Sequence, residues 1–295
     1  MAATEPRLVS GEAGVPALLR AALPSIPVVG SLPGVRKSAS GSFEGLAVTR
    51  EPVTVERASV EAYADVCQFP RKDTVPLPYP HMLAMPLHLA ILSDPGFPAP
   101  AIGTVHIENS ITAHRPITVG ETLGVTVSVG SPLPHPVGTA YQFATTVTSG
   151  DEVVWESVST YLRRGRRDPD AVWTSTLEDV PPTGPVFPLK GDLGRRYAKV
   201  SGDYNPIHLT PLTAKALGFP RHIAHGMWTK ARCLAALENR LPDAVRVDVA
   251  FKKPVFLPSA VAFGSRPSAD GSGYEFSLHK RGSDTLHLLG RTRAL

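Results

Sequence analysis

Tyr197-Ala-Lys-Val-Ser-Gly-Asp-Tyr-Asn-Pro-Ile-His-Leu-Thr-Pro-Leu-Thr-Ala214 is the stretch from which the fold and the chemistry can both be inferred. Its first residues predict the end of a helix at about 193–200, with Asp192 as the capping residue. Gly202 allows the backbone to leave the helix, and Pro206 prevents the helix from continuing. A polar loop and a new helical turn are expected to follow.

The loop brings three different polar groups within six residues of one another: the carboxylate of Asp203, the amide of Asn205 and the imidazole of His208. Taken singly, an Asp or Asn in a loop is more often a turn residue, and a His is more often a satisfied core or surface residue. Taken together, a carboxylate and an imidazole on one rigid loop can accept and deliver the protons of a water molecule. The combination therefore favours a catalytic loop.

The stretch resembles the signature of the MaoC-like (R)-specific enoyl-CoA hydratases, a branch of the hotdog superfamily. The matching positions are Tyr197, Val200, the run Ser201-Gly202-Asp203-x-Asn205-Pro206-Ile207-His208, and Ala214. A glycine eighteen residues after the histidine also matches, because Gly226 stands at that distance.

The resemblance implies a role for each of these residues. Asp203 and His208 would be the catalytic pair that shares one water, and Asn205 would orient the site. Gly226 begins a predicted helix, where a backbone N–H adds positive potential and can stabilise an oxyanion. Ser201 and Gly202 are expected beside the bound substrate, and the resemblance implies neither a metal nor another cofactor.

The remaining pattern predicts an α+β chain with a repeated order of elements. Strand-like runs occur at 46–56, 104–114, 121–130, 139–148 and 152–162, and again at 244–253, 259–267, 273–280 and 284–293. Helices are expected at 59–66, 81–92, 193–200 and 224–239, the first capped by Ser59 and the second containing Pro86. Each long helix thus precedes four strands.

The two halves share local sequence. Tyr63-Ala-Asp-Val66 returns as Tyr197-Ala-Lys-Val200, 134 residues later, and Arg115-Pro-Ile117 returns as Lys253-Pro-Val255, 138 residues later. A helix wrapped by an antiparallel sheet is the hotdog arrangement, and pairing two units covers an open sheet edge. We therefore predict a double hotdog, with two tandem units whose sheets are joined side by side.

The predicted boundaries are an N-terminal extension at 1–45, a first unit at 46–165, a linker at 166–185 and a second unit at 186–295. A short helix is conceivable at 15–23 within the extension. After Val66 the first unit lacks the Asp, Asn and His of the second, so it is expected to be a degenerate, non-catalytic copy. Its Pro-rich segment, 70–80, is expected to shape a pocket for an acyl chain.

Composition limits the other possibilities. The chain has 295 residues, a net charge of +4 and a pI of about 9.1, which is compatible with an anionic ligand such as CoA phosphates or an acidic carrier protein. Cys67 and Cys233 lack metal or disulfide spacing, and neither a signal peptide nor a long apolar run is evident, so a cytoplasmic protein without membrane association is expected. The cluster at 163–167 is interpreted as a solvated strand end rather than a nucleic-acid site. His222 and His225 lack a third metal ligand nearby in sequence.

The predicted activity is the reversible hydration of trans-2-enoyl thioesters to (3R)-hydroxyacyl thioesters in fatty-acid or polyketide-type metabolism. The substrate would be carried by CoA or by an acyl carrier protein, and a homodimer is possible. Open alternatives are a hotdog thioesterase, a hydratase of branched or dicarboxylic acyl-CoA, and a non-catalytic acyl-thioester-binding subunit.

Overall fold

The computed structural model describes residues 6–9, 43, 45–94, 96–99 and 103–295. The helix considered at 15–23 lies outside these residues. Within the extension, a two-residue strand, β1 (Arg7–Leu8), pairs in parallel with β2. Among the described residues, no helix combines the length and the apolar character needed to cross a membrane.

Eleven further strands form one sheet with β1. The first half of the chain contributes β2 (Ala47–Thr54), β3 (Thr104–Ala113), β4 (Thr122–Val129), β5 (Leu133–His135), β6 (Gly138–Ser149) and β7 (Glu152–Arg164). The second half contributes β8 (Val186–Leu189), β9 (Val245–Phe251), β10 (Ser259–Pro267), β11 (Gly273–Lys280) and β12 (Leu286–Ala294). Buried and more exposed residues alternate along β4, as expected for a strand with one face on the core.

The order of the strands repeats. From the outer edge inward, the first half runs β2-β4-β6-β7-β3, and the second half runs β8-β10-β11-β12-β9. In each half the second strand in sequence is therefore innermost, and β3 pairs antiparallel with β9 to join the two halves. This arrangement confirms the predicted double hotdog, with the short β5 as an addition on β6.

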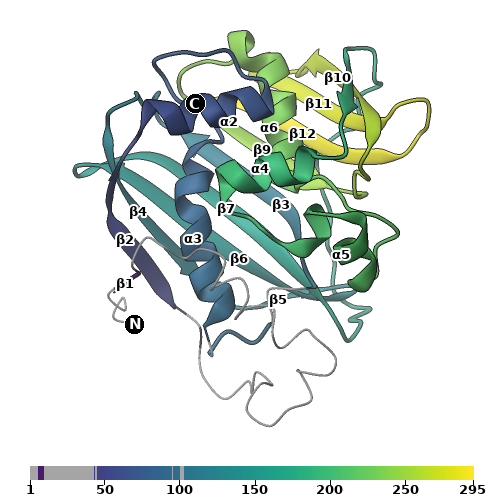
Figure 1. Cartoon of the computed structure of the whole chain (residues 1–295), viewed down its shortest axis with the longest axis horizontal. Coiled ribbons are helices and arrows are strands. Elements are labelled where there is room, and N and C mark those ends of the chain that lie inside the picture. Colours follow the sequence, from purple (N-terminus) through teal and green to yellow (C-terminus); the bar gives the residue numbers. More distant parts are fainter. Residues whose placement is uncertain (1–5, 10–42, 44, 95, 100–102) are drawn as a thin grey trace.

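The helices lie across the sheet (Figure 1). They are α2 (Arg57–Cys67), α3 (Pro80–Ser93), α4 (Leu193–Ser201), α5 (Pro211–Ala216) and α6 (Gly226–Leu237), with 3-10 turns η2 (Pro206–His208) and η3 (Glu238–Arg240). Helix α3 contacts β2, β4 and β6, and α6 contacts β11. The helix continues through Pro86, and ten of the fourteen residues of α3 are buried, which explains its apolar sequence.

The predicted cap at Ser59 is wrong, whereas Asp192 holds the predicted N-cap position but makes no capping hydrogen bond. Helix α2 begins at Arg57, so Ser59 lies inside the first turn, where its N–H donates to the carbonyl of Glu56. Asp192 does precede α4, but its backbone is already helical and its side chain accepts no capping hydrogen bond. A capping residue needs an extended backbone for its side chain to reach the first free N–H groups, and Asp192 does not have one.

The ends of α2 and α4 show the duplication at atomic detail. Gly202 ends α4 with φ 74° and donates its N–H to the carbonyl of Ala198. Gln68 ends α2 with φ 63° and donates to Ala64, 134 residues earlier in each case. By the same offset, the buried Phe69 stands where the second half has Asp203.

Residues 166–185 contain no helix or strand, yet they are fastened to the sheet. The indole of Trp173 donates to Glu108, and the N–H of the buried Val180 donates to Ser277 Oγ. The connection between the halves is therefore a strap packed on the sheet.

A buried lysine joins the halves at the pairing of β3 with β9. Burial lowers its pKa well below the usual value, while oxygen acceptors around its Nζ favour the charged form. Lys230 of α6 is fully buried, and its Nζ donates to Asn109 Oδ1 at 2.6 Å, to the Asn109 carbonyl at 3.2 Å and to the Val247 carbonyl at 3.2 Å. An ammonium has three N–H donors, so all three are used. Asn109 in turn donates its amide to Ser157 and Ser159 of β7.

Removing either side of this contact will destabilise the fold unequally. Asn109→Leu leaves a buried ammonium short of an acceptor and is expected to cost about 3–5 kcal/mol. Lys230→Met removes the charge and leaves only unpaired oxygens, at a cost of about 1–3 kcal/mol. Denaturant unfolding of both variants and of the double variant measures the coupling. A larger loss for Lys230→Met than for Asn109→Leu would contradict this account.

Candidate active site

The catalytic loop predicted from the sequence is built by three successive side-chain turns. Ser201 Oγ accepts from the N–H of Asp203, Asp203 Oδ1 accepts from the N–H of Asn205, and Asn205 Oδ1 accepts from the N–H of Ile207. Each side chain thus fixes the backbone two residues further on. Ser201 and Asn205 shape the loop, and direct contact of either with substrate stays a prediction.

His208 is held in one tautomer. Its Nδ1 lies 2.8 Å from the carbonyl of Ile223, which can only accept, so Nδ1 carries the proton and Nε2 keeps its lone pair. Burial, reinforced by the nearby His225, lowers the pKa of His208 to about 3, although Asp203 acts in the opposite direction. The imidazole is therefore neutral near pH 7 and its Nε2 can accept a proton.

Gly194 allows His208 to approach α4. A Cβ at this glycine would overlap the carbonyl oxygen of His208, because the first turn of α4 lies directly on η2. The helix predicted at 193–200 includes this residue, but no role in the site was predicted for it. Its place at the start of a helix preceding the loop gave no local signal, since the contact forms only in the tertiary structure.

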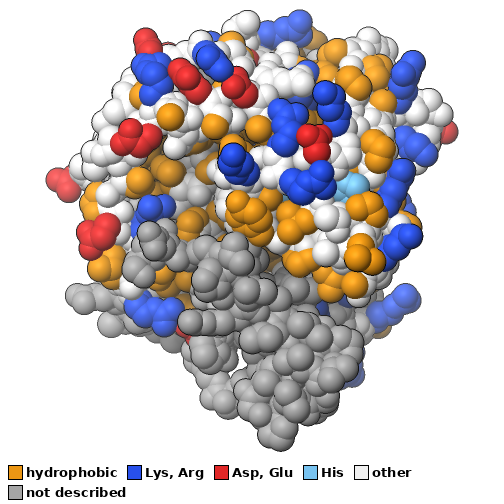
Figure 2. Space-filling view, in the orientation of Figure 1, with side chains coloured by type: hydrophobic (Ala, Val, Ile, Leu, Met, Phe, Trp, Pro, Cys, Tyr) orange, Lys and Arg blue, Asp and Glu red, His pale blue; other side chains and the backbone are white. Residues whose placement is uncertain are grey.

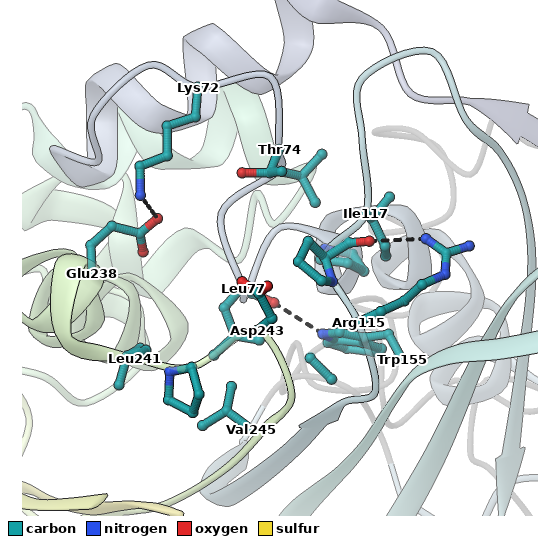
Figure 3. Close-up of a pocket in the computed structure, with 15 residues that line it drawn as sticks. Lys72, Thr74, Leu77, Arg115, Ile117, Trp155, Glu238, Leu241, Asp243 and Val245 are labelled. Atoms are coloured by element: carbon teal, nitrogen blue, oxygen red, sulfur yellow. Dashed lines mark hydrogen bonds and ion pairs between the residues drawn. The ribbon is translucent and has the colours of Figure 1, made fainter. Parts of the chain in front are cut away.

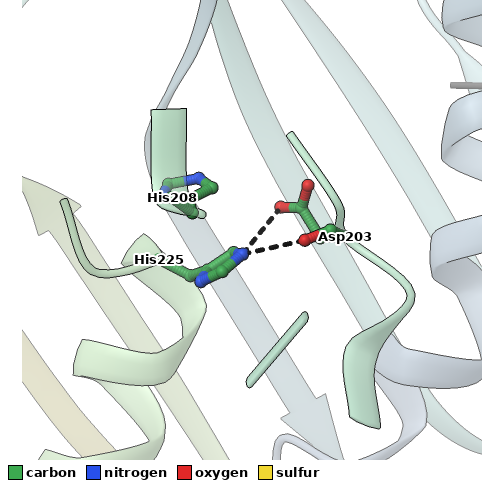
Figure 4. A group of neighbouring side chains, drawn as sticks. All are labelled: Asp203, His208 and His225. Carbon is green, nitrogen blue, oxygen red and sulfur yellow. Dashed lines mark hydrogen bonds and ion pairs between the residues drawn. The ribbon is translucent and has the colours of Figure 1, made fainter. Parts of the chain in front are cut away.

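His225 completes the group, and its role was not predicted from the sequence. It precedes α6, its ring stacks on His208 with centroids 3.7 Å apart, and its Nε2 donates to the backbone carbonyl of Asp203 at 3.0 Å (Figure 4). The same Nε2 is 3.8 Å from Asp203 Oδ2. The sequence signal available was its place directly before Gly226, the predicted start of the helix.

Gly226 is the first residue of α6, as predicted. The first N–H groups of a helix have no acceptor within it. A Cβ at Gly226 would lie 3.3 Å from the ring of Phe251, so a larger residue would crowd the approach to this helix end. The position suits a donor to an incoming oxygen atom.

The first half of the chain packs against this group. The hydroxyl of Tyr197 contacts the sulfur of Met82 on α3, and the ring of His106 on β3 lies 5.1 Å from that of Phe251. Burial, then Lys230, lowers the pKa of His81 to about 4, while Asp203 raises it. The site is therefore formed at the seam of the two halves.

The structure supplies further possible metal ligands beside His225, which the sequence spacing of His222 and His225 lacked. Asp203, His208 and His225 each offer a ligand atom, and these atoms lie within 4.8 Å of one another, so the group could hold a metal ion. His222, considered with His225 from their spacing, instead has its Nε2 2.7 Å from the carbonyl of Gly191.

The Pro-rich segment at 70–80 lines a pocket of about 130 Å³ between the two halves (Figure 3). Lys72 spans its rim in a salt bridge to Glu238, and Leu77 and Trp155 contribute to its lining. Neither Asp203 nor His208 lines it. A role of this segment in holding the acyl chain stays a prediction.

Comparison with known proteins identifies the architecture. A family model described as a MaoC like domain matches residues 174–268, which include the loop and α6. The 3-hydroxyacyl-thioester dehydratase X of Mycobacterium tuberculosis is 36% identical over 285 residues, covering 96% of this chain and 98% of that protein. The chain belongs to the MaoC-like dehydratase family.

Two solved structures and a shorter relative are also similar to this MaoC-like chain. The crystal structure of HtdX from M. tuberculosis has a TM-score of 0.74 at 38% identity, covering 84% of this chain and all of that one. A second M. tuberculosis protein, described as a double hotdog, has a TM-score of 0.53 at 14% identity, covering 87% and 99%, a likeness of fold alone. The (R)-specific enoyl-CoA hydratase of Aeromonas caviae is 35% identical over 69 residues, 22% of this chain and 52% of that protein.

Gly194→Ala should destabilise this MaoC-like chain by about 2 kcal/mol or more, because the added methyl group meets a backbone atom that cannot rotate away. Gly191→Ala is the matched control, since its Cβ would make an ordinary contact of 3.8 Å with Pro258. Thermal or denaturant unfolding measures both. Equal stability of the two variants would show that η2 does not lie as close to α4 as described.

Stability should fall as the pH is lowered from about 6.5 to 4. Burial holds the pKa of His208 at about 3, that of His81 at about 4, and those of His88 and His106 well below the usual value. In this window the unfolded chain binds protons that the folded chain does not, and each such histidine removes about 1.4 kcal/mol per pH unit. Denaturant unfolding at several pH values measures the slope, and His88→Gln should reduce it by one proton. A flat profile between pH 6.5 and 5 would contradict these pKa directions.

Proposed function

We propose that this chain catalyses the reversible hydration of trans-2-enoyl thioesters to (3R)-hydroxyacyl thioesters, in fatty-acid or polyketide-type acyl metabolism. The observation that carries the proposal is the pairing of a neutral, buried His208, whose Nε2 is unprotonated, with the carboxylate of Asp203 on one loop. The name of the M. tuberculosis relative, a 3-hydroxyacyl-thioester dehydratase matched over nearly its full length, supports the same reaction.

The proposed mechanism uses one water held between Asp203 and His208. His208 Nε2 accepts a proton as the water oxygen bonds to C3, and the electron pair of the double bond moves toward the thioester oxygen. The resulting enolate is stabilised by the N–H of Gly226 at the start of α6. A proton then returns through the pair to C2, so that the elements of one water are added. Dehydration follows the same steps in reverse.

Asp203 has two roles in the proposed mechanism: it is accessible to the water, and it stabilises the protonated form of His208. Its side chain is 24% exposed, so a water can reach it, whereas the side chain of His225 beside it is only 3% exposed. Its negative charge favours the imidazolium form of His208, which burial alone would oppose strongly. The carboxylate therefore helps the histidine to hold the transferred proton for the time the reaction needs.

We further propose a division of labour between the units. Residues 186–295 would carry the chemistry, and residues 46–165 would receive the acyl chain beyond the thioester, with 166–185 as the connecting strap. The support is the contact between Phe251, beside Gly226, and the first-half ring of His106, which in turn stacks on Tyr161. The free, buried Cys67 and Cys233 are compatible with a reducing compartment such as the cytoplasm.

Asp203→Asn and His208→Gln should each lower kcat by at least about a hundredfold, because each removes one partner of the proton transfer. Loss of the absorbance of the conjugated thioester measures turnover of crotonyl-CoA, and chiral analysis identifies the product. His114→Gln is the matched control, an exposed histidine paired with Glu156 away from the loop.

All variants should unfold at temperatures close to that of the parent chain. Near-normal turnover by either loop variant would refute the assigned pair. Release of free thiol without a 3-hydroxyacyl product would instead identify a thioesterase, and binding of enoyl-CoA without turnover by the parent chain would identify a non-catalytic subunit.

A further inference from the structure

The net positive charge of the chain is concentrated in one segment. Residues 190–221 hold six of the 30 Lys and Arg but only two of the 26 Asp and Glu, so the rest of the chain has 24 of each sign. One of the two acids is Asp203, which belongs to the proposed site. The segment therefore accounts for the whole formal charge of +4.

The six cations lie on elements that surround the site loop. They are Lys190, Arg195, Arg196, Lys199, Lys215 and Arg221, and all six are exposed. Three of them belong to α4, which leads into the loop, and one belongs to α5, which follows it. Figure 2 shows Lys and Arg side chains gathered over and beside α4. We call these six residues the basic surface.

The basic surface is not neutralised within the chain. Among the residues that the structure describes, none of its six cations forms a salt bridge, whereas Arg71 is paired with Asp65 and Arg115 with Glu121. Arg195 donates to the carbonyl of Leu209, and Arg221 lies over the ring of Phe256. Such a field attracts anionic partners over several ångströms and raises their association rate.

Exposed apolar side chains accompany these charges. Leu212 on α5 is 79% exposed, and Tyr204 in the loop itself is 36% exposed. An exposed leucine and an aromatic ring beside unpaired cations match the composition of a protein-binding surface, in which charged residues surround apolar contacts. A phosphate group alone would make no use of Leu212.

We propose that the basic surface docks an acidic acyl carrier protein and thereby presents its thioester to the loop of Asp203 and His208. This inference rests on the proposed function, since it names the carrier of that same substrate. The charges are spread over α4, α5 and the following segment, which suits the acidic face of a folded partner better than the compact phosphates of CoA.

The test uses the chain of 295 residues with three charges reversed: Arg196→Glu, Lys199→Glu and Lys215→Glu. No hydrogen bond or ion pair is formed by these three side chains in the described structure, so the fold should be kept. The matched control reverses three exposed cations beyond the site, Arg164→Glu, Arg166→Glu and Arg167→Glu. Both triple variants should unfold at temperatures close to that of the parent chain.

Turnover of crotonyl-loaded acidic carrier protein and of crotonyl-CoA is then compared. Reversal on the basic surface should raise KM for the carrier-bound substrate about tenfold or more while kcat and turnover of crotonyl-CoA stay unchanged, because rim charges act on association. The control should resemble the parent chain. An equal rise in KM for both substrates would overturn the proposal in favour of a CoA phosphate site. An unchanged KM for both substrates would overturn it as well, because the basic surface would then bind neither carrier.

Direct binding separates this proposal from the proposed function. The dissociation constant of the holo carrier protein, measured by calorimetry at low and at raised ionic strength, needs no turnover. Salt-sensitive binding that is lost in the basic-surface variant supports docking even if the parent chain hydrates neither substrate. Absence of binding by the parent chain overturns docking even if crotonyl-CoA is hydrated normally.

Discussion

The antiparallel pairing of β3 with β9 is the interaction on which the rest of the structure depends. It joins two five-stranded arrangements whose inner strands would otherwise expose unpaired backbone groups. Its register is fixed from within, because Lys230 reaches across to Asn109, and a slip of one residue would turn Asn109 to the opposite face of the sheet. The site loop of the second half is thereby held against α3 and β3 of the first.

The two halves share a scaffold but differ at the position of the proposed site. The N–H of Ala224 donates to the Val255 carbonyl before α6, and the N–H of Val75 donates to the Ile117 carbonyl before α3, with acceptors 138 residues apart. The scaffold is thus kept in both copies. The two copies differ in the segment after the first helix. In the first copy Phe69 stands in place of Asp203, and the described residues between α2 and α3 form no counterpart of η2 and α5. The first copy keeps the geometry of a site and fills it with apolar side chains.

Sequence reasoning succeeded where the determinants are local and failed where they are tertiary. Between β3 and β12, the strands that were predicted begin and end within about two residues of their predicted limits, because Gly and Pro turns separate them, whereas the short β5 and β8 were not predicted. The loop was recognisable from its own residues. The position of His225 depends on a partner 22 residues away, and that of Gly194 on a backbone contact. In the sequence, Lys230 is typical of a surface lysine on an amphipathic helix. Its burial depends on its tertiary contacts with β3 and β9.

The tautomers of His208 and His225 are set by main-chain carbonyls and not by the carboxylate of Asp203. His208 donates a hydrogen bond from Nδ1 to the carbonyl of Ile223, and His225 donates one from Nε2 to the carbonyl of Asp203. Neither ring therefore needs the Asp203 side chain as its hydrogen-bond partner. Oδ1 of that side chain accepts from the N–H of Asn205, whereas Oδ2 forms no hydrogen bond with any residue that the structure describes and lies 3.8 Å from His225 Nε2. The N–H of Asn205 thus fixes the orientation of the carboxylate, and in the proposed mechanism this leaves Oδ2 as the oxygen available to the water.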